Sequence, residues 1–241
     1  MKKALAAVAI LILVVAAVAF WAYHSLDVIV KYALEHYAPD VAGVTVKVGE
    51  VRISPRDGRG SLTAVEIGNP PGFSAPRAAR LGEISVAMNP VTASDPIVII
   101  HDITIDAPLI TYERGNKGTN LDAIQRNIEA YVKRSAASSD GKTAAGTGIR
   151  HRFVIERLAI RGAKVTMTNP ALKGQGVTFD LPDIELRDLG KRQGGLTASE
   201  VANIVATTLI ARIAQRLLTN VDLLRRGGVG GALDALKGLI R

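Results

Sequence analysis

Histidines and carboxylates are the side chains of this 241-residue chain best suited to acid–base or metal chemistry, and they are sparse. The four histidines are His24, His36, His101 and His151. Only His101, followed by Asp102 and then Asp106, resembles a set of metal ligands. Adjacent residues of a strand point to opposite faces, so we do not expect His101 and Asp102 to share a metal. The sequence instead indicates a solvated strand edge at this point.

The motifs of common enzyme classes are absent from the sequence. There is no cysteine, which excludes a thiol nucleophile, a thiolate zinc site and a disulfide framework. No Gly-x-Ser-x-Gly elbow, phosphate-binding loop ending in lysine or His-Glu-x-x-His motif occurs. Asp180 and Asp183 flank Pro182 and are expected to face solvent. We therefore expect a protein that is not an enzyme and that carries no cofactor or metal.

Composition favours a folded, basic protein. Apolar residues make up 48% of the chain, which suits one core shared by one or two domains, and aromatic residues only 4%. The net charge of +8 fits either nucleic acid or anionic lipid headgroups. The bases are scattered, with no dense run beyond Arg225-Arg226 and no aromatic stacking platform. We expect membrane lipids as partners, and no nucleic acid.

The N-terminal segment has the length and flanks of a membrane anchor. After Met1-Lys2-Lys3, an uninterrupted apolar run extends over residues 4–23. About 20 helical residues span the roughly 30 Å hydrocarbon core of a bilayer. Trp21 and Tyr23 close the run at the depth where amphipathic rings favour the interface. The lysines at positions 2 and 3 predict that residues 1–3 are cytoplasmic and the bulk of the chain is exported.

A cleaved signal peptide is the alternative to an anchor. Its apolar region would be about 7–15 residues long and would end in small residues, whereas Phe20-Trp21 occupies the place of such a site. Beyond the anchor, residues 24–40 keep apolar side chains at helical spacing. Pro39 is expected to stop this helical extension, with a turn at Ala38-Pro39.

From residue 41 onward the apolar pattern alternates, as in strands. One spacing recurs four times: two apolar residues at alternate positions, a gap of two residues, and two more apolar residues at alternate positions. The four copies are Val46, Val48, Val51 and Ile53; Val98, Ile100, Ile103 and Ile105; Phe153, Ile155, Leu158 and Ile160; and Phe179, Leu181, Ile184 and Leu186. The gap reverses the strand parity, which predicts a bulge or bend at the same place in each copy. The second and third copies match further, because Ile110 and Tyr112 follow one as Val165 and Met167 follow the other.

Helices and further strands are predicted around these repeats. Additional strands are expected at 61–67 and 81–88, and Thr119-Asn120 precedes a helix over 121–134. Thr197 and Glu200 form a capping box, after which apolar residues recur every four positions from Val201 to Val221. A short final helix is expected at 232–241. This C-terminal segment either packs over the sheet or lies on a membrane or partner.

Several of these motifs resemble the N-terminal region of the AsmA family, bacterial envelope proteins anchored in the inner membrane. After the anchor come Val51-x-Ile53-Ser54-Pro55, Ile67-Gly68-Asn69-Pro70-Pro71-Gly72-Phe73, Ile103-x-Ile105-x-x-Pro108, Tyr112-Glu113 and Thr119-Asn120-Leu121. The resemblance covers the chain to about Tyr131. It implies a periplasmic β-groove related to bridge-like lipid-transfer proteins, with a role in outer-membrane lipid homeostasis. The chain is much shorter than the large members, so a short groove or an accessory subunit is expected.

The expected fold is α+β: an N-terminal transmembrane helix, then a curved antiparallel sheet or groove with one inserted helix and a C-terminal helical segment. The expected parts are residues 1–3 in the cytoplasm, the membrane helix 4–23, the helical extension 24–40, the periplasmic β domain 41–190 and amphipathic helices at 191–241. The resemblance and the N-terminal run together imply a location in the bacterial inner membrane, crossed once. Residues expected to line a lipid groove are Val98, Ile100, Ile103, Ile105, Ile110, Phe153, Ile155, Leu158, Ile160 and Val165.

Three functions remain in contention on the sequence. An apolar sheet face left uncovered would mark a lipid or partner site, whereas the same face covered by the C-terminal helices would be an ordinary core. The leading hypothesis is a non-enzymatic envelope protein that handles or shields lipid acyl chains. The rival is a structural subunit that docks onto a larger membrane protein complex. An exported hydrolase would need a convergent polar site that the sequence does not display.

Overall fold

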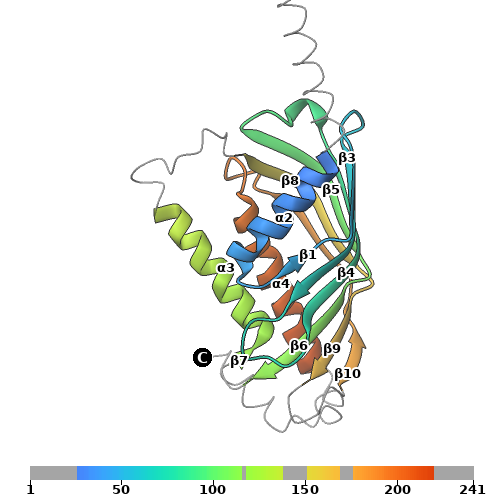
Figure 1. Ribbon diagram of the computed structural model, residues 1–241, viewed down its shortest axis with the longest axis vertical. Coiled ribbons are helices and arrows are strands. Elements are labelled where there is room, and N and C mark those ends of the chain that lie inside the picture. Colours follow the sequence, from blue (N-terminus) through green and yellow to red (C-terminus); the bar gives the residue numbers. More distant parts are fainter. Residues whose placement is uncertain (1–25, 116–117, 138–150, 169–175, 220–241) are drawn as a thin grey trace, which may run out of the picture.

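A computed structural model describes residues 26–115, 118–137, 151–168 and 176–219. They form one large, open, mostly antiparallel sheet with three long helices, a mixed α+β fold. Figure 1 shows the sheet nearly edge-on, with the three helices on one side of it. That side is called the inner face. The expected anchor at 4–23, with Trp21 and Tyr23, and the expected final helix lie outside the described residues.

The helices are α2 (Leu26–Ala42), α3 (Asn120–Ala137) and α4 (Ala198–Thr219), with a short 3-10 turn η1 (Pro90–Thr92). The strands are β1 (Val46–Lys47), β2 (Glu50–Ser54), β3 (Arg59–Gly68), β4 (Arg77–Met88), β5 (Ile97–Asp106), β6 (Leu109–Gly115), β7 (Gly118–Thr119), β8 (Arg152–Arg161), β9 (Lys164–Thr168), β10 (Val177–Asp180) and β11 (Ile184–Leu189). The inserted helix and the C-terminal helix are thus observed among the described residues.

Register shows that most of these strands are halves of six longer ones. One long strand consists of β5 and β6, because both pair with the same neighbouring strands. In the same way β8 and β9 form one long strand, β10 and β11 form another, and β1 and β2 form a further one along β3. The six long strands lie side by side in chain order. Each is antiparallel to the next except at one place, where β5 and β6 run parallel to β8 and β9.

The parallel pair corrects the expectation of a wholly antiparallel sheet. Parallel neighbours need a crossover connection, and α3 with the segment after it supplies one between β7 and β8. The crossover also brings the second and third repeat copies together residue for residue. Val98 pairs with Phe153 and Ile105 with Ile160, and the match continues as Ile110 against Val165. Periodicity revealed the repeat but carried no information about the direction of pairing.

All six long strands bend along one transverse line, here called the kink line. Its members face one another in register: Gly49, Ala64, Gly82, Ala107, Gly162 and Pro182. Ala64 and Ala107 have φ of 51° and 45°, and Gly162 has φ of 59°. Pairing is interrupted at the line, but the register is the same on both sides of it, so no extra residue is inserted there. The Gly162 amide also donates to the Asp183 carboxylate at 3.0 Å, which fixes the last strand at the line.

The predicted bulge is confirmed as a register shift in the second copy, and the gaps fall on two different lines across the sheet. In the first and fourth copies the gap falls at the kink line, beside Gly49 and Pro182. In the second copy it falls at His101, where the register of β5 against β4 shifts opposite Ala87 and Met88. The spacing therefore predicts the bulge of the second copy correctly, but it does not show which gaps align across the sheet.

The expectation that Pro39 ends the N-terminal helix is wrong. α2 continues through Pro39 to Ala42. Proline lacks an N–H and removes one helical hydrogen bond, yet here the last turn is held by one bond of its own and by one contact from α3. The Gly43 amide donates to the Pro39 carbonyl at 2.7 Å, and the Asn127 side chain donates to the Ala42 carbonyl at 3.0 Å. Contact with α3 thus offsets the local preference for a break.

Candidate apolar site on the inner face of the sheet

The inner face of the sheet is apolar in every row between the kink line and the bulge at His101. One row across the six strands consists of Val51, Leu62, Ile84, Ile105, Ile160 and Ile184. The adjacent row consists of Ile53, Gly60, Val86, Ile103, Leu158 and Leu186. No polar group converges on this surface from the strands. Its chemistry is therefore limited to apolar contact.

The outer face of the same strands carries charged and small polar residues. Arg157 bridges Asp102 on β5 and Glu185 on β11, the latter at 3.6 Å between Nε and Oε2. Lys164 pairs with Asp180 at 2.7 Å, a contact that lowers the pKa of the exposed Asp180. The two faces thus differ as expected for a sheet with one covered and one solvated side.

His101 and Asp102 do not lie at a strand edge, which corrects that expectation. β5 is an interior strand between β4 and β8. His101 Nδ1 lies 3.0 Å from the Glu156 carboxylate, and Asp102 pairs with Arg157. Both side chains contact charged residues of β8. Among the described residues no group of three or more histidines and carboxylates is placed to hold a metal ion.

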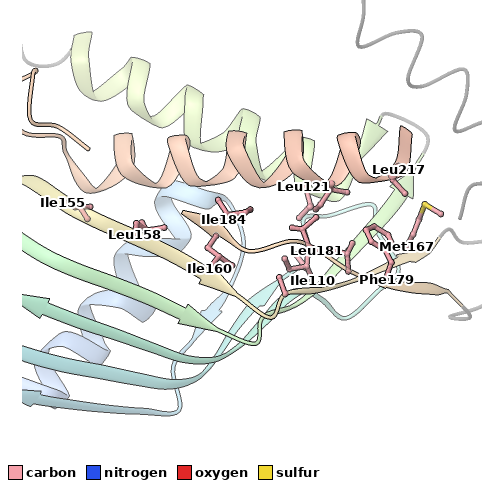
Figure 2. Packing of buried hydrophobic residues seen from close by; sticks show 14 of the residues in the cluster. Ile110, Leu121, Ile155, Leu158, Ile160, Met167, Phe179, Leu181, Ile184 and Leu217 are labelled. Carbon is pink, nitrogen blue, oxygen red and sulfur yellow. The ribbon is translucent and has the colours of Figure 1, made fainter. Parts of the chain in front are cut away.

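The predicted groove residues come together on the inner face and are mostly buried. Seven of the ten are less than 10% exposed: Val98, Ile100, Ile110, Ile155, Leu158, Ile160 and Val165. The other three, Ile103, Ile105 and Phe153, are partly buried against the same cluster. Figure 2 shows α4 running along the strands above four of these side chains, those of Ile110, Ile155, Leu158 and Ile160. The greater part of the predicted groove is consequently the packed core of the described structure.

α4 is the main cover of this region. The Glu200 carboxylate accepts from the Thr197 amide at 2.7 Å, while the Thr197 hydroxyl accepts from the Glu200 amide at 3.2 Å, so the predicted capping box is confirmed. Ile213 and Leu217 are buried, and Val201, Val205 and Leu209 pack partly against the cluster. By length and composition α4 is also the one helix among the described residues that could cross a membrane.

α2 covers the part of the inner face that lies over the first strands of the sheet, away from α4. Val30 and Leu34 pack on a second buried cluster of Val48, Val51 and Val65. Asp27 accepts a hydrogen bond from the Ile53 amide at 2.8 Å, and Glu35 accepts one from the Val48 amide at the same distance. α2 thereby lies antiparallel to the first long strand. Two carboxylates satisfy backbone donors on this sheet edge, which blocks further strand pairing there.

Between the α4 side and the α2 side, the middle strands keep an apolar strip that is only partly covered. We call it the half-buried band, and it consists of Ile53, Leu62, Ile84, Val86, Ile103 and Ile105. The first three pack on the cluster of Val48, Val51 and Val65 beneath α2, called the α2-side cluster. The last three pack on the larger cluster beneath α4, called the α4-side cluster. None is below 9% exposure, although all six are large apolar residues. The band is therefore a part of the inner face that keeps some apolar surface exposed, and it is the candidate site.

A second constellation, missed in the sequence, lies at the far end of the sheet around Glu113. Its carboxylate accepts from the Ser74 amide at 2.7 Å, the Ser74 hydroxyl at 2.6 Å, the Ala75 amide at 2.8 Å and the Asn69 side chain at 3.0 Å. Burial raises the pKa of Glu113, but these hydrogen bonds outweigh it and hold the pKa below its ordinary value. The carboxylate is therefore ionised at neutral pH.

Asn120 completes this Glu113 cluster. Its side chain accepts from the Glu113 amide at 2.9 Å and donates to Asn69 and to the Thr111 carbonyl at 2.8 Å. Three motifs that carry the AsmA resemblance, at 67–73, 112–113 and 119–121, thus meet in one buried network. The resemblance was the sequence signal that could have pointed to this cluster, because motifs that lie apart in the chain can contribute to one network in the fold. With both carboxylate oxygens saturated, the cluster fixes the 69–75 loop and offers no free group for catalysis.

An open depression lined by residues of both faces, Ile53 and Val86 of the band among them, is less suited to a specific ligand. Arg52, Arg59, Ser61, Ser85 and Asp102 are among its lining residues. Arg52 is paired with Glu50 at 2.9 Å and Asp102 with Arg157, so two of its charges are already compensated. The half-buried band is the stronger candidate site. No protein-family model and no curated protein matches the chain.

Proposed function

We propose that this chain is a non-enzymatic, membrane-anchored envelope protein of the AsmA type that handles or shields lipid acyl chains. In this proposal residues 4–23 cross the inner membrane, residues 1–3 are cytoplasmic, and the sheet and helices are periplasmic. The observation that carries it is the half-buried band, a continuous apolar strip over four adjacent strands with no polar group converging on it.

The chemistry of the band suits acyl chains better than polar ligands. Burial of a methylene contributes on the order of 0.8 kcal/mol, so a chain held over a few carbons gains several kcal/mol before ordering costs. Headgroup selectivity is expected to be low, because the six residues of the half-buried band carry no donor or acceptor in their side chains. The sealed region under α4 would support the band without itself holding lipid.

The rival function, an accessory subunit of a larger membrane complex, is favoured by a different surface. α2 exposes Val28, Ile29, Tyr32 and Tyr37, with exposed fractions between 47% and 69%. Tyr32 also stacks on His36, with ring centroids 4.1 Å apart, so this helix presents an ordered, partly aromatic face. A partner helix could bury such a face.

Native mass spectrometry of the gently purified full-length protein, followed by lipid extraction, separates the two functions. We expect stoichiometric phospholipid that is lost in Ile84→Glu and retained in Ser85→Glu. These neighbouring residues of β4 lie on opposite faces, so the control adds the same charge next to the band without entering it. Circular dichroism would verify that both variants are folded. Protein partners in fixed ratio with no bound lipid would overturn the lipid function and favour the subunit.

A further inference from the structure

The position of α2 limits how far the sheet can lie from the proposed anchor. The apolar run ends at Tyr23, and the described helix begins at Leu26. A chain advances at most about 3.6 Å per residue, so three steps place Leu26 within roughly 11 Å of the end of the run. If residues 4–23 cross a bilayer, the start of α2 lies at its surface.

One end of the sheet is tied to this start of α2. The Asp27 carboxylate accepts from the Ile53 amide, close to where β2 ends. The turn at 55–58 follows, and the Gly58 carbonyl accepts from the Met88 amide at 2.7 Å, next to the 89–96 connection. In Figure 1, α2 begins at the same end of the molecule as the connection between β4 and β5.

Further contacts join the remaining connections to the same end. The Arg152 amide donates to the Pro96 carbonyl at 2.8 Å, and the Arg152 guanidinium donates to the Gly195 carbonyl at 2.6 Å. The connections 55–58, 89–96 and 190–197, with residues 151–152, therefore form one continuous surface. We call it the anchor-side end.

The anchor-side end exposes apolar residues that the fold does not need there. Val91, in η1, is 82% exposed, more than any other large apolar residue on the described surface, and Ile97 is 40% exposed. The turn that presents Val91 is ordered by hydrogen bonds, since the Asn89 side chain accepts from the Val91 amide at 3.0 Å. Exposed basic residues on or next to these connections are Arg56, Arg59, Lys191 and Arg192, and exposed acidic ones are Asp57, Asp95 and Asp188, with Lys191 paired to Asp188 at 3.1 Å.

We propose that the anchor-side end docks on the bilayer from which α2 emerges, with Val91 immersed in the interface. Basic side chains around an apolar tip match the headgroup region of a membrane containing anionic lipid. The inference rests on the N-terminal anchoring in the proposed function. It also explains why the half-buried band lies between the kink line and this end, since docking would place the band next to the lipid supply.

The absence of native cysteine allows a direct test with single-cysteine variants of the full-length protein. Val91→Cys, Val28→Cys and Leu109→Cys each carry a bimane label, in vesicles of phosphatidylethanolamine and phosphatidylglycerol with or without brominated acyl chains. Val28 is 69% exposed on the first turn of α2, and Leu109 is 50% exposed beyond the kink line. All three positions are exposed, so labelling should leave the fold intact.

We expect bromine to reduce emission at least twofold at positions 91 and 28 and to leave position 109 unchanged. Quenching at 28 without quenching at 91 would overturn the docking inference while the anchor stands. No quenching at either position would overturn both the docking and the anchoring. Equal quenching at 91 and 109 would contradict docking through one end, because the whole outer side would then lie on the membrane.

Discussion

Ile160 and Ile105 are neighbours in one row of the inner face, yet they belong to different regions of the molecule. Ile160 is 4% exposed beneath α4, whereas Ile105 belongs to the half-buried band between the α4-side and α2-side clusters. The strands that present them have the same periodicity and the same side-chain type. What separates a packed core from a candidate lipid site is therefore the helical cover and not the chemistry of the sheet. The predictions below are directed at that difference.

A charge introduced beneath α4 should lower the stability of the fold far more than a charge introduced in the half-buried band. Ile160→Asp would bury a carboxylate without a partner and is expected to lower the free energy of unfolding by about 4 kcal/mol or more. Ile84→Asp, in the same row but in the half-buried band, should cost only about 1–2 kcal/mol, because the carboxylate can reach water. Urea unfolding followed by circular dichroism measures both. Similar losses would show that the band is as closed as the α4 side.

The Glu113 cluster should stabilise the covered far end of the sheet and have no effect on the band. Glu113→Gln keeps the shape but places an amide where donors from Ser74, Ala75 and Asn69 converge, which should cost about 1–3 kcal/mol. Lipid binding per folded molecule should be unchanged. A variant that stays fully stable yet loses lipid would place the site at this cluster instead.

The effect of Glu113 should also depend on pH in one direction. The pKa of this carboxyl is lower in the folded than in the unfolded chain, where it is about 4.3. The contribution of Glu113 to stability is therefore complete above the pKa of the unfolded chain, and it is lost as the pH falls through the pKa of the folded chain. The stability gap between wild type and Glu113→Gln should shrink on acidification below about pH 4. A gap that is constant from pH 7 to pH 3 would contradict this account.

The kink line gives the smallest effects, and they have opposite signs. Gly162→Ala forces a side chain into φ of 59° and should cost about 1–2 kcal/mol. Ala107→Gly, at φ of 45°, should gain up to about 1 kcal/mol, less the entropy of a freer unfolded chain. Gly194→Ala is the control, because its φ is 65° and no atom lies within 4 Å of the added Cβ. Thermal unfolding resolves these differences, and equal losses in all three variants would remove any special role for the line.

Local patterns in the sequence predicted much of the secondary structure. Strict alternation located the strands, the capping residues Thr197 and Glu200 located the start of α4, and the gap at His101 predicted a bulge. These features depend on residues close together in the chain. Pro39 was misjudged because the contact that completes α2 comes from Asn127, 85 residues away along the chain.

Burial of the inner face could not be derived from periodicity. Val165 and Ile103 have equally good strand patterns, but only Val165, which is 0% exposed, is sealed. Whether a face is covered depends on where a distant amphipathic helix docks, and α4 docks through only two fully buried residues, Ile213 and Leu217. Likewise, the meeting of Asn69, Glu113 and Asn120 required the folded topology, although each residue lay in a motif singled out in the sequence.

Photo-cross-linking with a phospholipid that carries a diazirine in its acyl chain tests the central claim most directly. The full-length protein would be irradiated in vesicles, digested and mapped by mass spectrometry. The account predicts adducts on Leu62, Ile84, Ile103 or Ile105, together with the anchor, and none on Ile155 or Ile184 beneath α4. Adducts confined to the anchor and the outer surface of α2 would contradict it, because the band would then be closed to lipid.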